Sequence, residues 1–169
     1  MPLFAAADPA AHGTPDPAVR VRRATAADVA GLASVAATRG SLPGGFAGRA
    51  AAWVTDPGRT VLVADRAGVV VGWAMLARWS GYDDAPDGTY VSALTVHPAR
   101  WRTGTGSRLL AALLDRARGD VRSVVNARNT PSLALHERHG FREAGRAATY
   151  AGIEFDGGTG VLLHREETA

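Results

Sequence analysis

Hydrophobic and polar residues alternate along the chain in patterns that predict a series of strands and helices. The run VRVRR at 19–23 alternates apolar and basic residues, as a strand with one buried face does. The motif TAAD at 25–28 resembles a capping box, with Asp28 in place of the usual glutamate, and predicts a helix that continues to about Thr38. A second helix is expected from Ala47 to Val54.

The middle of the chain contains three strand-like runs and one amphipathic helix. The apolar runs at 60–65 and 69–76 are separated by only three residues, a spacing that predicts a hairpin. After a polar loop, residues 89–97 predict a third long strand. A helix is expected at 105–118, because its apolar side chains lie on one face, namely Leu109, Leu110, Leu113, Leu114 and Ala117.

Another helix is predicted within NTPSLALHERHGF, residues 129–141. Thr130 is expected as its N-cap and Pro131 as its first residue, where a missing N–H has no consequence. Gly140 is expected just beyond its last turn, with Phe141 folding back over that turn.

The remaining strands complete the predicted fold. One is expected at 121–127, and two more, 145–155 and 159–166, surround the turn signal Asp156-Gly157. Hairpins followed by a strand-helix-strand unit predict an α/β fold with a mixed, mostly antiparallel central sheet, flanked by helices on both faces. The strand that ends at His97 and the strand that begins at Val121 should be parallel neighbours.

Length and composition limit the organisation of the chain. Its 169 residues, 46% of them hydrophobic, fit one globular domain, which we expect over residues 19–169. Residues 1–18 are rich in Ala, Pro and Asp without periodicity and are expected to form a flexible arm. No apolar run approaches the length of a membrane span, and the first residues do not resemble a signal peptide, so we expect a cytoplasmic protein without a membrane partner.

Two residue types are missing, and each absence excludes a kind of chemistry. The chain has no cysteine, which excludes disulfides, thiolate metal sites and a cysteine nucleophile; we expect no metal site. All 19 basic residues are arginine, so there is no lysine for a Schiff base or a P-loop. The arginines are scattered among acidic residues rather than gathered in a stripe, so we expect no nucleic-acid partner.

One stretch, HPARWRTGTGSRLL at 97–110, combines arginines and glycines at the start of a helix. A helix N-terminus exposes N–H groups and a partial positive charge, and glycine lets an anion approach the backbone closely. The glycines are Gly104 and Gly106, and the nearby guanidinium groups belong to Arg100, Arg102 and Arg108. This pattern predicts a pyrophosphate site. A dinucleotide fingerprint is excluded because Leu109 stands where its third glycine is required.

The run LTVHPARWRTGTGSRLLAALLDRA, followed after a strand by NTPSLALHERHGFREAG, resembles the GNAT superfamily of acyl-CoA-dependent N-acyltransferases. Its second motif resembles the branch of phosphinothricin and related amino-acid-analogue acetyltransferases. The resemblance implies that the main chain from Arg102 to Ser107 holds the pyrophosphate of acetyl-CoA and that Asn129 contacts the cofactor. It also implies that main-chain groups of Leu94 and Val96 meet the pantetheine arm. The implied cofactor residues are Leu94, Val96, Arg100, Trp101, Arg102, Thr103, Gly104, Thr105, Gly106, Ser107 and Asn129.

Trp101 departs from the family pattern, because it occupies a position where the family has Gln or Arg. That position contributes mainly its backbone N–H, so we expect cofactor binding to survive, with Arg100 and Arg102 compensating in charge.

The acid and base of the reaction are less well defined by the resemblance. The family often has a tyrosine at the position of His136, where it protonates the departing CoA thiolate. His136 can take this role, or it can be a structural residue at the helix end, in which case Tyr150 is the alternative acid. The strand at 89–97 has no carboxylate, so the base is a water relayed by backbone carbonyls, Ser92, or an acid from the 82–87 loop. The oxyanion would meet a strand N–H between Leu94 and Val96.

The resulting prediction is an N-acetyltransferase that transfers an acetyl group from acetyl-CoA to a primary amine of a small molecule, peptide or protein. The alternative is a non-catalytic acyl-CoA sensor, because the cofactor motif is intact while the acid and base positions are not clearly filled. In this family the acceptor pocket is built from segments that correspond to 39–53 and 79–87, which have the least recognisable pattern. Dimerisation is common in the family, but nothing in the sequence demonstrates it.

Overall fold

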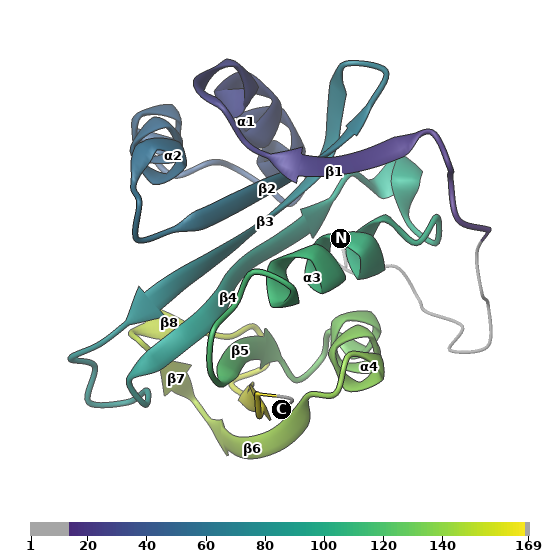
Figure 1. The fold of residues 1–169 in the computed structure, drawn as a ribbon. Helices are drawn as coiled ribbons and strands as arrows, with labels where there is room; N and C mark the ends of the chain where they lie inside the picture. The colour runs from purple at the N-terminus through teal and green to yellow at the C-terminus, as the bar shows by residue number, and fades with distance from the viewer. Residues whose placement is uncertain (1–13, 168–169) are drawn as a thin grey trace. The chain divides into compact units, whose positions relative to one another are not determined.

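The computed structural model describes residues 14–167 and contains a seven-stranded sheet (Figure 1). β4 and β5 pair in parallel, as expected, whereas β1–β2, β2–β3, β5–β9 and β6–β9 pair antiparallel. The mixed, mostly antiparallel sheet is therefore confirmed. The strand order is β1 (Val19–Arg23), β2 (Thr60–Arg66), β3 (Val69–Trp79), β4 (Gly88–Val96), β5 (Val121–Asn126), β9 (Gly160–Arg165) and β6 (Arg142–Ala147).

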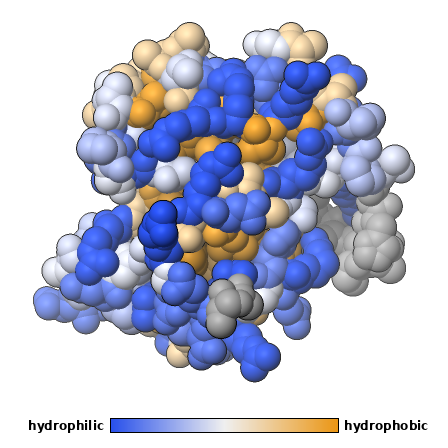
Figure 2. Space-filling view, viewed as in Figure 1, coloured by the Kyte–Doolittle hydropathy of each residue, from blue (hydrophilic) through white to orange (hydrophobic). Residues whose placement is uncertain are grey.

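The described chain divides into two compact units, and β3 and β4 pass from one into the other. The first unit contains residues 14–76 and 93–116, and the second contains residues 77–92 and 117–167. The expectation of one domain over 19–169 stays a prediction. Hydrophilic residues cover most of the face seen in Figure 2, and apolar residues show between them.

In the first unit, helices cover both faces of the sheet. α1 (Val29–Ala37) and α2 (Phe46–Thr55) pack on the face that carries Val61, Val63, Trp73 and Met75. Successive residues of a strand point to opposite faces, so Gly72 belongs to the other face. There α3 (Thr105–Leu114) lies close, because a Cβ at Gly72 would be only 3.2 Å from Cδ1 of Leu109.

The capping box predicted at 25–28 is present and is joined to an ion pair. Oδ2 of Asp28 accepts a hydrogen bond from the main-chain N–H of Thr25 at 2.8 Å. Arg22 donates to both carboxylate oxygens of Asp28, each at 2.8 Å, and its Nη2 also lies 2.9 Å from Oδ2 of Asp65. The hydrogen bonds from Arg22 are the main reason that the pKa of Asp28 falls to about 2. A 3-10 turn (Ala26–Asp28) precedes α1 here.

In the second unit, an aromatic core fills the space beside the sheet. The ring of Trp79 stacks on Tyr90 with centroids 4.1 Å apart, and the Tyr90 hydroxyl donates to the main-chain oxygen of Pro86 at 2.7 Å. Tyr150 and Leu162 belong to the same buried cluster. α4 (Thr130–Arg138) belongs to this unit as well.

The expected strand at 145–155 is wrong in its extent. β6 ends at Ala147, and a separate hairpin of β7 (Thr149–Tyr150) and β8 (Ile153–Glu154) follows it. The reason is a tight turn in which Ala151 (φ 50°) and Gly152 (φ 71°) both adopt left-handed backbone conformations. The helix expected at 105–118 is also shorter, because α3 ends at Leu114 with Asp115 as its C-cap.

The flexible arm expected over residues 1–18 stays a prediction. Residues 1–13 lie outside the described residues. Asp16, in contrast, is held by the first unit: its N–H donates to the main-chain oxygen of Thr103 at 3.2 Å, and its Oδ2 accepts from Nε of Arg66 at 2.8 Å. Long-range contacts of this kind leave no signal in the local pattern.

Candidate active site

The stretch between β4 and α3 forms a compact turn in the first unit. A 3-10 turn, Pro98–Arg100, follows His97, whose Nδ1 accepts from the N–H of Ala99 at 3.2 Å. Arg102 (φ 64°) and Gly104 (φ 73°) then take left-handed conformations and lead the chain into α3. Such a conformation is costly for a residue other than glycine, and strained residues of this kind cluster at functional sites.

The first turn of α3 has the features of an anion site. Its N-cap is Gly104, so no side chain caps the N–H groups of this turn. The hydroxyls of Thr103 and Thr105 are hydrogen-bonded to each other at 2.8 Å, and Thr103 also donates to the main-chain oxygen of Arg100. The turn that carries Gly104 and Gly106 is therefore held rigidly by its threonines, with its amides suited to phosphate oxygens.

The arginines around this turn share an internal anion. Oδ2 of Asp16 lies 2.8 Å from Nε of Arg66 and 3.7 Å from Nη1 of Arg100. Arg108 donates from Nη1 to the main-chain oxygen of Asp16 at 3.0 Å. A hydrogen bond from the N–H of Ala18, followed by that from Arg66, lowers the pKa of Asp16, so its carboxylate is charged at neutral pH. Of the three arginines expected around the turn, Arg100 and Arg108 both contact Asp16, which the sequence did not reveal, and the part of Arg102 stays a prediction.

Trp101 joins this loop to the end of β4. Its indole Nε1 donates to the main-chain oxygen of Val96 at 2.9 Å, although 42% of the residue is exposed. This carbonyl was expected to be available to the pantetheine arm. One of its two lone pairs is used by Trp101, which leaves the second for a ligand.

The last residues of β4 lie beyond its pairing with β5. The parallel register runs from Thr89–Val121 to Val91–Ser123. The paired residues of β4 end at Val91, so Leu94, Thr95 and Val96 are not paired with β5. The hydroxyl of Thr95, a buried residue, accepts a hydrogen bond from Nη1 of Arg39 at 3.2 Å. Arg39 was not singled out from the sequence, because the two partners are 56 positions apart, beyond the reach of any local pattern.

In the second unit, Asn129 rather than Thr130 is the N-cap of α4. Its Oδ1 accepts from the N–H of Ser132 at 3.2 Å, and Pro131 consequently becomes the second residue of the helix. Proline remains compatible with this position, since the first-turn amides have no partner within the helix. The cap uses only Oδ1, so the amide NH₂ of Asn129 is the group suited to a cofactor contact.

His136 is buried near the end of α4, with 2% of its surface exposed. Its Nδ1 lies 2.8 Å from the main-chain oxygen of Ser132, which can only accept, so Nδ1 carries the hydrogen. Burial lowers the pKa of His136, which makes the neutral ring the stable form at pH 7. Nε2 is buried without a hydrogen-bond partner among residues 14–167. Phe141 packs edge-to-face on the ring at 5.0 Å, as expected for the residue after Gly140.

These contacts of His136 favour the structural role that the sequence left open, and its role as an acid stays a prediction. Tyr150 is also buried, and burial is the main cause that raises the pKa of its phenol, so it keeps its proton at neutral pH. Ser92 lies on β4, half-buried, immediately after the residues that pair with β5. The roles of Tyr150 and Ser92 stay predictions as well.

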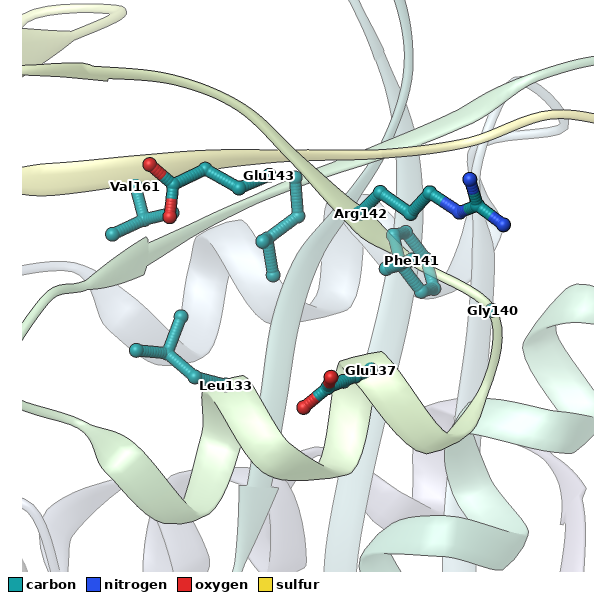
Figure 3. Close-up of a pocket in the computed structure, with 8 residues that line it drawn as sticks. Leu133, Glu137, Gly140, Phe141, Arg142, Glu143 and Val161 are labelled. Carbon is teal, nitrogen blue, oxygen red and sulfur yellow. The ribbon is translucent and has the colours of Figure 1, made fainter.

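A groove of about 540 Å³ lies between α4 and the strands β6 and β9 (Figure 3). Figure 3 shows Leu133 and Glu137 on the helix side, with Glu143 and Val161 on the strand side. None of its lining residues belongs to the predicted site. It is lined by Leu133, Glu137, Gly140, Phe141, Arg142, Glu143, Val161 and Leu163.

The predicted residues thus fall in both units. The cofactor residues from Leu94 to Ser107 belong to the first, and Asn129, His136, Tyr150 and Ser92 belong to the second.

No helix among residues 14–167 is long and apolar enough to cross a bilayer.

Two relatives share part of this sequence. The L-methionine sulfoximine/L-methionine sulfone acetyltransferase of Salmonella typhimurium is 35% identical over 88 residues, which are 50% of this chain and 51% of that protein. The L-amino acid N-acyltransferase MnaT of Escherichia coli is 35% identical over 91 residues, 52% of either protein. The chain therefore spans about half the length of the curated relatives it matches.

The fold is shared with solved structures. A GNAT superfamily phosphinothricin acetyltransferase from Sinorhizobium meliloti, in complex with AcCoA, superposes with a TM-score of 0.70 at 23% identity, over 88% of either chain. Residues 35–141, more than half of this sequence, match the family described as the acetyltransferase (GNAT) family. The expected fold and family are thus confirmed, and the chain belongs to the acetyltransferase (GNAT) family.

Proposed function

We propose that this protein transfers the acetyl group of acetyl-CoA to the amine of a small molecule. The observation that carries the proposal is the turn before α3. It combines a left-handed Arg102, a glycine N-cap and an uncapped helix N-terminus. Such a turn suits a pyrophosphate, because helix amides and the helix dipole act on the same anion.

The end of β4 supports the same ligand. Its residues after Val91 lie beyond the register with β5, and an extended pantetheine arm can add to such a strand through its amides. In this proposal, main-chain groups of Leu94 and Val96 bind the arm, and an N–H between them meets the oxyanion that forms at the thioester carbon. Trp101 holds Val96 in place through its indole.

The reaction is a direct attack. The neutral amine forms a bond to the acetyl carbon, the C–S bond breaks, and CoA leaves as a thiolate that takes up a proton. Tyr150 and His136 are the candidate donors of that proton. Tyr150 has the advantage that its raised pKa keeps the proton available at neutral pH. The amine loses its proton to a water molecule, which Ser92 can hold in place by a hydrogen bond.

Small amines are the proposed acceptors because both sequence relatives are named for amino acids or their analogues. Peptide amines remain the second class to test.

The experiment is acceptor-dependent release of CoA, followed with a thiol reagent. The protein contains no cysteine, so the reagent reports only CoA. The panel contains amino acids, amino-acid analogues, polyamines, aminoglycosides and peptides, and the acetylated product is verified by mass. Release with a small amine supports the proposal. Calorimetric binding of acetyl-CoA without release on any acceptor contradicts it and supports the sensor alternative.

A further inference from the structure

The guanidinium of Arg39 reaches a buried hydroxyl of the first unit. Arg39 follows the C-cap of α1, Thr38, and its Nη1 donates to the hydroxyl of Thr95 at 3.2 Å. Among the described residues, no carboxylate lies within ion-pair distance of this guanidinium. Arg22, in contrast, pairs with Asp28 and Asp65, and Arg66 pairs with Asp16.

The side chain of Arg39 is partly exposed and partly desolvated. The residue as a whole is exposed, but its guanidinium reaches the hydroxyl of the buried Thr95. Burial lowers the pKa of Arg39. Arginine nevertheless stays charged at neutral pH. A partly desolvated cation that remains reachable from solvent is suited to an incoming anion.

Arg39 is attached to the part of β4 where transfer would occur. Thr95 lies between Leu94 and Val96, whose main chain binds the pantetheine arm in the proposed function. The side chain of Thr95 points to the same face of β4 as Ala93, because residues two apart share a face. Ala93 packs against the cluster of α1, α2 and Trp73.

This face holds a second unused donor. The indole N–H of Trp73 is buried and has no acceptor among residues 14–167. Trp73 stacks on Trp53 with ring centroids 6.2 Å apart, so the donor belongs to a fixed aromatic cluster. This indole is buried within the cluster, so Arg39, and not Trp73, is the donor that an incoming molecule can reach.

From these contacts we propose that Arg39 binds the carboxylate of the acceptor and so selects α-amino acids; the inference rests on the proposed function. The planar guanidinium matches a carboxylate, with two parallel hydrogen bonds. In an α-amino acid the amine and the carboxylate are on the same carbon, so a carboxylate held beside Thr95 keeps the amine near the strand. Polyamines and amino-acid amides lack the anion and would meet an uncompensated positive charge.

The test compares methionine with methioninamide, two amines that differ at the carboxylate. Arg39→Gln removes the charge and keeps much of the length, and Arg39→Lys keeps the charge. Arg116→Gln is the matched control, because Arg116 is exposed and donates only to the main-chain oxygen of Ala112. Circular dichroism and the thermal midpoint verify that each variant folds.

We expect wild type to prefer methionine, and Arg39→Gln to lower kcat/KM for methionine by about 10- to 100-fold. The kcat/KM for methioninamide should change little, and Arg39→Lys should recover part of the lost kcat/KM for methionine. Arg116→Gln should behave as wild type on both acceptors. If Arg39→Gln reduces both acceptors equally, or neither, the inference is overturned.

A binding measurement separates this inference from the proposed function. Calorimetry records the affinity of wild type and Arg39→Gln for N-acetylmethionine, which keeps the carboxylate and needs no turnover. Weaker binding to Arg39→Gln in a protein that releases no CoA would support the carboxylate site and overturn the proposed activity. Equal affinity for both proteins, or none for wild type, would overturn the inference whatever the activity.

Discussion

The indole nitrogen of Trp101 donates a hydrogen bond to the main-chain oxygen of Val96, five residues earlier in the chain. This bond joins the loop that precedes α3 to the last residue of β4. The two segments are the proposed binding sites for the pyrophosphate and the pantetheine arm of one cofactor. A residue that departs from the family pattern thus connects the two parts of the site.

Replacing Trp101 by Phe keeps an aromatic ring and removes this hydrogen bond. We expect KM for acetyl-CoA to rise about two- to tenfold, the effect of one lost hydrogen bond, with kcat little changed. Steady-state kinetics with varied acetyl-CoA measures this. Val69→Ala, at another exposed hydrophobic residue, is the control. An unchanged KM would mean that Val96 needs no support from the indole.

Gly106→Asp places a carboxylate in the first turn of α3, where the phosphates are proposed to bind. The fold should tolerate it, because acidic residues favour helix N-termini. Acetyl-CoA binding should be lost, which calorimetry measures. Gly48→Asp makes the same change early in α2, where a Cβ meets nothing within 4 Å, and should bind acetyl-CoA normally. Normal binding to a folded Gly106→Asp variant would refute the pyrophosphate site.

Asp16 holds its negative charge beside Arg66 and Arg100, close to the proposed phosphate site. Asp16→Asn should strengthen CoA binding about two- to fivefold, because it removes repulsion of the phosphates and leaves Arg100 unpaired. The gain should shrink as salt screens these charges. A titration at low and high ionic strength tests both points. Weaker binding by Asp16→Asn would instead show that the carboxylate orients the arginines for the ligand.

The ion pair of Arg22 with Asp28 predicts a defined loss of stability in acid. The folded pKa of Asp28 is about 2, below its ordinary value of 3.8, so its contribution is complete above 3.8 and disappears as the pH falls towards 2. The free energy of unfolding should fall by about 2 kcal/mol over this range on account of Asp28. Urea unfolding at several pH values should show a shallower decline for Asp28→Asn. Asp115→Asn, at an exposed residue, is the control and should follow wild type. If Asp28→Asn also followed wild type, the ion pair would contribute nothing to the acid sensitivity.

The two candidate acids can be separated by parallel substitutions. His136→Phe should keep kcat within about threefold of wild type, because the neutral ring has its one hydrogen committed to Ser132. Tyr150→Phe should lower kcat by about 100-fold, the usual contribution of an acid, without changing the affinity for acetyl-CoA. Single-turnover kinetics and calorimetry give the two quantities. The reverse pattern would assign the proton to His136, and two fully active variants would assign it to water.

Local features of this protein were predictable from the sequence because they depend on neighbouring residues. The capping box at Thr25 and Asp28, the hairpin of β2 and β3, and the packing of Phe141 on His136 all involve partners within a few positions. The same is true of the turn before α3, whose glycines and arginines are consecutive. The order of these elements also restricted the topology, which is why the parallel pairing of β4 and β5 could be expected.

The predicted ends of two elements were wrong, because the local sequence is compatible with more than one structure there. Asn129 and Thr130 are both good N-caps, and only the backbone geometry selects Asn129. The run at 145–155 has the composition of a strand, yet the left-handed turn at Ala151 and Gly152 divides it.

Only the tertiary structure determined which distant polar groups are in contact. Asp16 lies against Arg66 and Arg108, 50 and 92 residues away, and Arg39 reaches Thr95 across 56 residues. Sheet pairing and helix packing set these distances, and the pattern around each residue contains no information about them. The sequence by itself predicted the elements, the family and the cofactor turn, whereas the folded chain decided which arginines meet an internal carboxylate, because only sheet pairing and helix packing bring such distant residues together.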